Sequence, residues 1–140
     1  MEIILLSGDN CCGKTTTLTM VYDTLTKGMN SKPEKILINP KIKKDFHCSF
    51  TCKEKNKEVA IVTFGDVLYL FIEMIILYST VDCLIIAFSK GGNTLEHILQ
   101  FFCNCKQHTH INKTVCKKEA AKDEKDKANL IDCNKIISAI

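Results

Sequence analysis

The sequence contains no arginine, because all nineteen of its basic residues are lysine. Lysine presents a point charge, whereas the planar guanidinium of arginine binds phosphate through two parallel hydrogen bonds. Arginine also supplies the positively charged finger of many phosphoryl-transfer sites. The chain therefore cannot supply an arginine finger to a phosphoryl-transfer site.

Long apolar runs and the features of a secretory leader are also missing. The longest apolar run, 67–78, is interrupted by Glu73 and is shorter than a bilayer crossing requires. Residues 1–7 have no basic start and no long apolar core, so they do not predict a signal peptide. We expect a cytoplasmic protein that does not bind membranes.

Cysteine is abundant, yet the pattern does not indicate disulfides. The nine cysteines are an odd number without secretory context, so we expect reduced thiols. The net charge of +3 is too small to indicate a nucleic-acid binder. With 140 residues, 46% apolar and 25% charged, the chain predicts one globular domain over residues 1–140.

Apolar runs and turn residues alternate along the chain and predict strands that alternate with helices. Strands are expected at 2–7, 35–39, 46–52, 59–64, 83–89 and 109–116. Helices are expected at 15–27, at 67–79, from Asn93, and at a closing stripe of Leu130, Cys133, Ile137 and Ile140. The segments 46–52 and 59–64 indicate a hairpin. Together they predict a single three-layer α/β domain with a mostly parallel sheet and one antiparallel hairpin.

The helix expected at 67–79 is apolar on all sides, since Glu73 is its only charged residue. Such a helix is either buried or part of an interface. Burial against the sheet is the simpler expectation. Contact with a protein partner, or with a second copy of the chain, is the alternative.

Residues 8–15, Gly-Asp-Asn-Cys-Cys-Gly-Lys-Thr, fit the pattern G-x-x-x-x-G-K-[ST] between a buried strand and an amphipathic helix. Glycines let such a loop curl so that backbone N–H groups point at phosphate oxygens, and the following helix adds its positive N-terminus. Lys14 can reach the β- and γ-phosphates, and the Thr15 hydroxyl can ligate Mg²⁺. The alternative is a glycine-rich turn with an incidental lysine.

On this motif and on the order of strands and helices, the sequence resembles the P-loop NTPase superfamily, in a domain similar to the nucleotide kinases. The resemblance implies a nucleoside triphosphate and Mg²⁺ as ligands. It implies that the nucleotide is bound by Gly8, Asp9, Asn10, Cys11, Cys12, Gly13, Lys14, Thr15 and Thr16. It identifies no single family, because kinases, GTPases, motor proteins and ATPases share this Walker A loop.

A second carboxylate on the Mg²⁺ side is expected after a buried strand. Asp66 follows the strand at 59–64, whereas Asp82 precedes its strand and belongs at the opposite edge of a parallel sheet. Asp66 is equally suited to cap the helix that follows it. We expect Thr15 and Asp66 at the metal, and Lys14 and Asp66 in catalysis, with Asp66 orienting water or an acceptor hydroxyl.

Three further segments have weaker signals. Guanine recognition normally uses an N-K-x-D run, which this sequence lacks. The segment with the most similar spacing, 116–119, is better explained as part of a solvated charge run. We therefore expect ATP as the ligand, or no discrimination between bases. Lys90 leaves a strand on the ligand side and contacts a phosphate or acceptor, or is a surface lysine. A third segment contains donor types that bind zinc: Cys103, Cys105, His108 and His110. Their spacing is not that of a standard zinc finger, and the end of an apolar helix is the simpler interpretation of this segment.

The sequence thus predicts Mg²⁺-dependent ATP binding with slow hydrolysis, or phosphoryl transfer to an unidentified acceptor. The alternative is a non-catalytic nucleotide-binding switch that acts through a protein partner. A third hypothesis is a metal-dependent interaction protein with a vestigial loop, and it depends on the Cys/His cluster.

Overall fold

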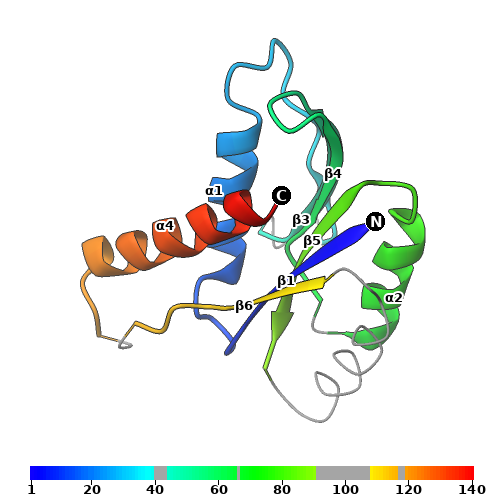
Figure 1. Ribbon diagram of the computed structural model, residues 1–140. Helices are drawn as coiled ribbons and strands as arrows, with labels where there is room; N and C mark the ends of the chain where they lie inside the picture. Colours follow the sequence, from blue (N-terminus) through cyan, green and yellow to red (C-terminus); the bar gives the residue numbers. More distant parts are fainter. Residues whose placement is uncertain (40–43, 66, 91–107, 117–118) are drawn as a thin grey trace.

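A computed structural model describes residues 1–39, 44–65, 67–90, 108–116 and 119–140 of the chain (Figure 1). In these ranges six strands and three helices follow one another: β1 Glu2–Gly8, α1 Lys14–Leu25, β2 Ile36–Leu37, β3 Phe46–Cys52, β4 Lys57–Val62, α2 Leu68–Leu77, β5 Cys83–Ser89, β6 His108–Asn112 and α4 Lys122–Ala139. The alternation of apolar runs therefore predicted the α/β class correctly. The helix expected from Asn93 lies outside the described residues.

The strands form one sheet in the order β2-β3-β4-β5-β1-β6. Strands β4, β5, β1 and β6 run parallel to one another, whereas β3 runs antiparallel to β4 and β2 antiparallel to β3. The mostly parallel sheet and the hairpin are confirmed. The strand expected at 35–39 is only Ile36–Leu37, and both side chains are exposed, by 52% and 37%. With little to pack against, this edge strand pairs over two residues only.

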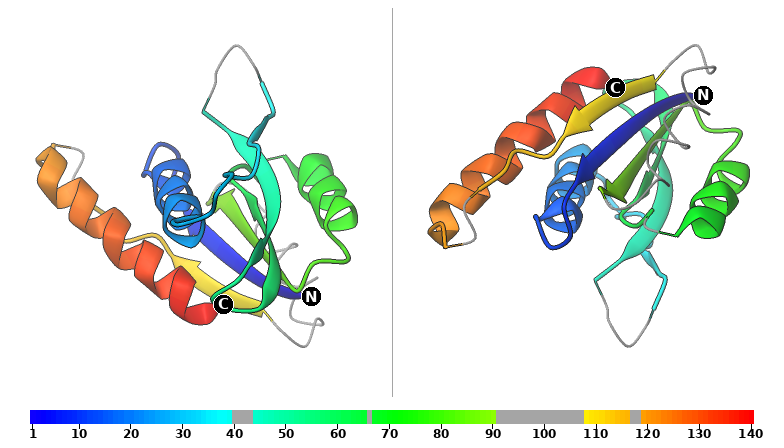
Figure 2. Two further views of the ribbon diagram at one scale, coloured as in Figure 1. Left: turned by 90° about the horizontal axis from the view of Figure 1, so that it is seen from above. Right: turned by 90° about the horizontal axis from the view of Figure 1, so that it is seen from below.

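Helices cover both faces of the sheet, α1 and α4 on one and α2 on the other (Figure 2). Each face has its own apolar cluster. In β1, Ile4 and Leu6 belong to the cluster with α1 and α4, whereas Ile3 and Leu5 belong to the cluster with α2. Because the side chains of β1 alternate between two faces that are both covered, every residue in the apolar run of this strand is buried, and the run contains no polar residue.

Helix α2 is far more exposed than the sequence suggested. Within the helix only Phe71 and Met74 are buried. Large apolar side chains on it and at its start are 43% to 68% exposed: Val67, Leu68, Tyr69, Ile72, Ile76 and Leu77. The expectation that this helix is buried is wrong. A helix packed on a sheet buries only one of its sides, and apolar residues on the other sides do not by themselves place another element over them. Across the described ranges, none of the helices combines the length and apolarity that a membrane crossing requires.

Helix α4 begins at Lys122, inside the charged run, so it is longer than the expected closing helix. Leu130, expected on its buried stripe, is 49% exposed, while Cys133 and Ile140 are buried as expected. The buried stripe is shifted because two polar side chains, Asn129 and Asp132, are buried where the helix packs toward α1 and the end of β6.

Candidate functional site

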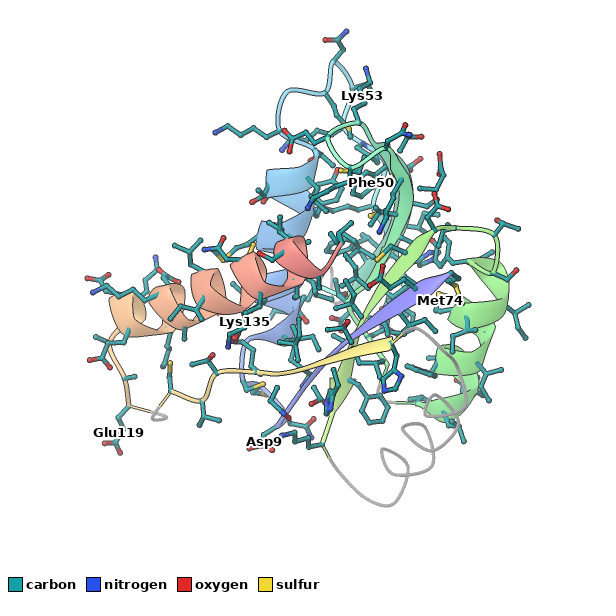
Figure 3. All side chains as sticks on the ribbon, viewed as in Figure 1. Asp9, Phe50, Lys53, Met74, Glu119 and Lys135 are labelled. Atoms are coloured by element: carbon teal, nitrogen blue, oxygen red, sulfur yellow. The ribbon has the colours of Figure 1, made fainter. Side chains whose placement is uncertain are left out.

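The carboxyl ends of β1, β4, β5 and β6 lie at one edge of the sheet, because these strands are parallel. The loop from β1 to α1 starts at this edge. Figure 3 shows Asp9 of the loop at the opposite end of the sheet from Lys53, which lies in the β3–β4 turn. Open α/β sheets bind ligands at the edge where their parallel strands end.

The loop backbone is tightly curled. Cys11 and Gly13 have φ of 59° and 91°, both in the left-handed region that cysteine rarely adopts. The N–H of Cys12 turns back toward the carbonyl oxygen of Asp9 at 3.4 Å. Among the described residues no side chain caps α1 at Gly13, so N–H groups of its first turn point toward the loop. Such a helix start favours a bound anion.

The ammonium group of Lys14 is folded back over the loop. It donates hydrogen bonds to the carbonyl oxygens of Gly8 (3.0 Å) and Asp9 (2.8 Å) and to Oγ of Ser89 (2.8 Å). Lys14 is only 9% exposed. All three partners are neutral, and among the described residues no carboxylate forms an ion pair with Lys14. The site therefore carries a nearly buried positive charge that these residues leave uncompensated.

The loop candidates differ in exposure. Gly8 and Lys14 are buried, Cys12, Gly13 and Thr15 are half-buried, and Asp9, Asn10, Cys11 and Thr16 are exposed. The nine residues run from the end of β1 through the loop into the first turn of α1, where Lys14 reaches back to the carbonyls of Gly8 and Asp9. Which of them touch a ligand stays a prediction.

Two glycines of the loop are required by close neighbours. A Cβ atom at Gly8 would lie 2.6 Å from Sγ of Cys12 and 2.7 Å from Cβ of Lys113. A Cβ atom at Gly13 would lie 2.9 Å from Oδ1 of Asn129, which also accepts a hydrogen bond from the Thr17 hydroxyl at 3.3 Å. The loop is therefore shaped partly by the segment after β6 and by α4, and no motif near residue 8 predicts these contacts.

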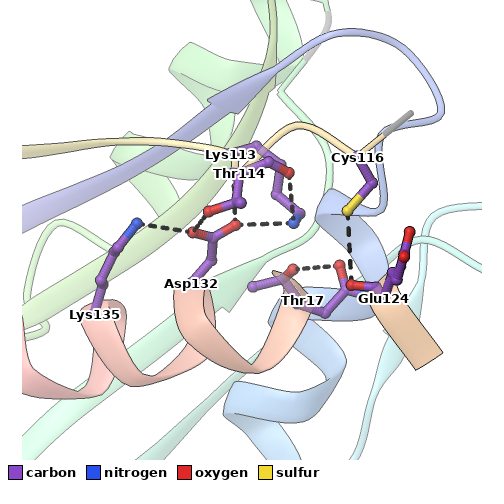
Figure 4. Close-up of polar contacts among 8 residues, drawn as sticks. Thr17, Lys113, Thr114, Cys116, Glu124, Asp132 and Lys135 are labelled. Atoms are coloured by element: carbon purple, nitrogen blue, oxygen red, sulfur yellow. Dashed lines mark hydrogen bonds and ion pairs between the residues drawn. The ribbon is translucent and has the colours of Figure 1, made fainter. Parts of the chain in front are cut away.

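Lys113 is held by a buried ion pair with Asp132 of α4 (Figure 4). The carboxylate of Asp132 accepts hydrogen bonds from Nζ of Lys113 (2.8 Å) and from N and Oγ1 of Thr114 (2.8 and 2.7 Å). Burial alone would raise the pKa of this carboxyl group, but the bonds from Lys113 and Thr114 and the charge of Lys113 hold it below its usual value. The pair fixes Lys113 against Gly8.

Thr15, the predicted metal ligand, donates a hydrogen bond from Oγ1 to Oδ1 of Asp45 at 3.0 Å. The sequence pattern did not indicate Asp45, because in a parallel sheet only carboxylates that follow strands are expected at this edge. Asp45 precedes β3, but β3 is antiparallel to β4, so its start lies at the edge where β4 ends. The predicted hairpin already contained this signal. Asp66 lies outside the described residues, and its role stays a prediction.

The structure also describes two further residues that the sequence singled out, Asp82 and Lys90. Asp82 lies at the opposite edge, as expected, where its carboxylate accepts the N–H of Glu58 at 2.9 Å. The side chain of Lys90 is exposed, while its backbone N–H donates to the Gly8 carbonyl at 2.9 Å. The neighbouring Ser89 is the residue of β5 that contacts Lys14. Whether the side chain of Lys90 contacts a phosphate or acceptor, or is a surface lysine, stays a prediction.

The Cys/His cluster is described only in part. Cys103 and Cys105 lie outside the described residues, and His108 and His110 lie on β6. Nε2 of His110 is 2.6 Å from Oγ of Ser7, and burial together with the charges of Lys90 and His108 lowers the pKa of His110. Within the described ranges no group of three or more His, Cys, Asp or Glu side chains has the arrangement of a metal site. Zinc binding stays a prediction.

No protein-family model, curated protein sequence or solved structure matches this chain. What the site does is therefore inferred from the geometry of its own residues, and above all from the surroundings of Lys14.

We expect Asp132→Asn to destabilise the protein by about 3–5 kcal/mol, because it leaves the ammonium of Lys113 buried without its counter-charge. The melting temperature should fall by on the order of 10 °C. Asp126→Asn, at an exposed position of the same helix, should change it little. Adding Lys113→Met to Asp132→Asn should recover part of the loss. No recovery would contradict the ion pair as the cause.

The same pair predicts a pH dependence. The folded-state pKa of Asp132 lies below its usual value of 3.8, so the pair contributes its full stability above that value. This contribution is lost as the pH falls through the folded-state pKa. The difference in stability between the wild type and Asp132→Asn, measured by urea unfolding, should be constant near neutral pH and narrow only below about pH 4.

The loop thiol Cys11 should be alkylated faster than the cysteines of the sheet. Cys11 is exposed, whereas burial raises the pKa of Cys48 to about 11 and that of Cys83 to about 12. Mass spectrometry after brief iodoacetamide treatment at pH 8 should show labelling at Cys11 roughly tenfold or more above Cys83. Equal labelling would show that the loop does not expose this thiol in solution.

Proposed function

We propose that this chain binds a nucleoside triphosphate, with ATP as the first candidate, together with Mg²⁺ in the loop of residues 8–16. The observation that carries the proposal is the ammonium of Lys14, which is 9% exposed and whose hydrogen bonds to described residues all go to neutral oxygens. Withdrawing a charge from water is costly unless an opposite charge is close. The phosphate groups of a triphosphate supply that charge.

The surroundings of Lys14 support a phosphate ligand over a single carboxylate. Left-handed φ angles at Cys11 and Gly13, and a start of α1 that no described side chain caps, are features of loops whose backbone N–H groups bind phosphate. A chain of phosphates can contact these groups and the ammonium at once. This arrangement agrees with the roles that the resemblance to P-loop NTPases implies for Gly8 to Thr16.

The donor atoms beside Thr15 fit Mg²⁺. The hydroxyl groups of Thr15 and Thr63 and the carboxylate of Asp45 are hard oxygen donors, the kind that Mg²⁺ prefers. Bound Mg²⁺ would neutralise part of the charge on the phosphates. The residues of the loop would hold the phosphates close to the ammonium of Lys14.

The reaction that follows from binding is slow hydrolysis or phosphoryl transfer to an unidentified acceptor. Phosphoryl transfer depends mainly on positioning and on neutralising the developing charge. Lys14 provides one cation for this purpose, and Asp66 is the residue proposed to orient water or an acceptor hydroxyl. The chain has no arginine to add a second positive group, so turnover without a partner protein is slow.

A second candidate function is a nucleotide-binding switch that acts through a protein partner. The exposed apolar side chains of α2 favour it, because contiguous apolar surface of this kind is typical of interaction sites. A Cβ atom at Gly65 would collide with the Ala87 carbonyl oxygen of β5 and lie 3.2 Å from the Phe71 ring of α2, so Gly65 itself packs closely against both elements. Phosphate release with ATP and Mg²⁺ separates the candidates: turnover supports the enzyme, and tight binding without turnover supports the switch.

Lys14→Ala should abolish the thermal stabilisation that ATP and Mg²⁺ give to the wild type. The substitution removes the charge that faces the phosphates, while the folded domain remains, because Lys14 contacts the loop and the end of β5 and not the apolar core. Differential scanning fluorimetry over a panel of nucleotides, each with and without Mg²⁺, measures the effect.

The control for this experiment is Lys27→Ala, which removes an exposed lysine just beyond the far end of α1. Its stabilisation by ATP should equal that of the wild type. If Lys14→Ala is also stabilised to the wild-type extent, the loop does not bind the triphosphate through Lys14 and the proposed function is wrong.

A further inference from the structure

Asp45 lies immediately before β3, at the edge of the sheet that carries the loop. Because β3 and β4 are antiparallel, His47 pairs with Val62, and the residues just outside this pair are Asp45–Phe46 and Thr63. The carboxylate of Asp45, at the start of the antiparallel strand β3, therefore lies beside the end of the parallel strand β4. A carboxylate that followed β3 would lie at the opposite edge.

Both hydroxyl groups next to Asp45 approach the same carboxylate oxygen. Oγ1 of Thr15 is 3.0 Å from Oδ1 of Asp45, and Oγ1 of Thr63 is 3.3 Å from it. Thr63 is 3% exposed, and its hydroxyl also accepts the backbone N–H of Phe46 at 2.8 Å. Thr63 therefore holds a fixed position at the end of β4, and Asp45 lies between it and the first turn of α1.

Two other described carboxylates near the sheet edges, those of Asp132 and Asp82, are committed elsewhere. Asp132 is buried with Lys113 and Thr114, and Asp82 accepts the N–H of Glu58 at the far edge. Asp45 is half-buried, so this residue is not enclosed in the core. Among the described residues it is the carboxylate in contact with Thr15.

We propose that Asp45 supplies the carboxylate on the metal side of the nucleotide site, the role that the sequence analysis gave to Asp66. The inference rests on the proposed function, since Thr15 is the residue that the resemblance places at Mg²⁺. A carboxylate that orients a metal-ligating hydroxyl, or binds the metal directly, raises metal affinity typically 10–100-fold.

The contact between Asp45 and Thr15 has a purely structural alternative, in which it only ties β3 to α1. Asp45→Asn separates the two roles. The amide oxygen of asparagine still accepts the hydrogen bond from Thr15, but the negative charge that attracts a divalent cation is gone.

The experiment measures the affinity of the full chain for a fluorescent ATP analogue in excess Mg²⁺ and in EDTA. The quantity compared is the gain in affinity that Mg²⁺ brings. Asp45→Asn should reduce this gain by about tenfold or more, while its affinity in EDTA stays equal to that of the wild type or rises. Asp66→Asn and the far-edge control Asp82→Asn should keep the wild-type gain.

A second readout is independent of turnover and of the fluorescent group. Mn²⁺ replaces Mg²⁺, and the free Mn²⁺ is followed by electron paramagnetic resonance in the presence of a non-hydrolysable ATP analogue. Asp45→Asn should bind Mn²⁺ about tenfold or more weakly than the wild type. If Asp45→Asn does not fold, Asp45→Ser is measured in its place, with the same expectation.

Each outcome bears on one of the two proposals. A wild type that binds no triphosphate in either buffer overturns the proposed function, and the role of Asp45 with it. A wild type whose binding depends on Mg²⁺, with an undiminished gain in Asp45→Asn or Asp45→Ser, overturns the role of Asp45 alone. Loss of the gain in Asp66→Asn but not in Asp45→Asn returns the role to Asp66.

Discussion

A nearly buried ammonium group, that of Lys14, joins three parts of the site. Its hydrogen bonds to the Gly8 and Asp9 carbonyls and to the Ser89 hydroxyl connect the start of α1 with the ends of β1 and β5. The neutral partners satisfy the N–H groups but do not cancel the charge. Among the described residues the charge of Lys14 has no counter-charge, and this is the property on which the proposal of a phosphate ligand rests.

The position of the loop depends equally on α4. Asn129 packs where Gly13 has no side chain, and Asp132 holds Lys113 against Gly8. A buried ion pair adds little stability compared with a well-packed apolar pair, but its hydrogen bonds permit only one arrangement of its neighbours. In this structure that arrangement places the segment after β6 beside the loop, so the polar residues of α4 contribute geometry more than stability.

The sequence predicts best what depends on neighbours in the chain. Continuous apolar runs give the parallel strands, and the loop motif gives its candidates in one segment, because both signals are local. Asp45 was missed because its place depends on the direction of β3, and Asn129 because helical periodicity treats buried asparagine as exposed. The exposure of α2 depends on how much of that face other elements cover, which the composition of the helix does not determine.

The contacts that shape the loop span most of the chain: the bond from Thr17 to Asn129 joins positions 112 residues apart. Closing a chain segment of this length has an entropic cost, which the other contacts of the fold must offset. The shape of the loop therefore depends on α4 as well as on the residues of the loop itself. Ligand binding at residues 8–16 would then act on the global folding equilibrium, and occupancy of the loop would report the integrity of the whole domain.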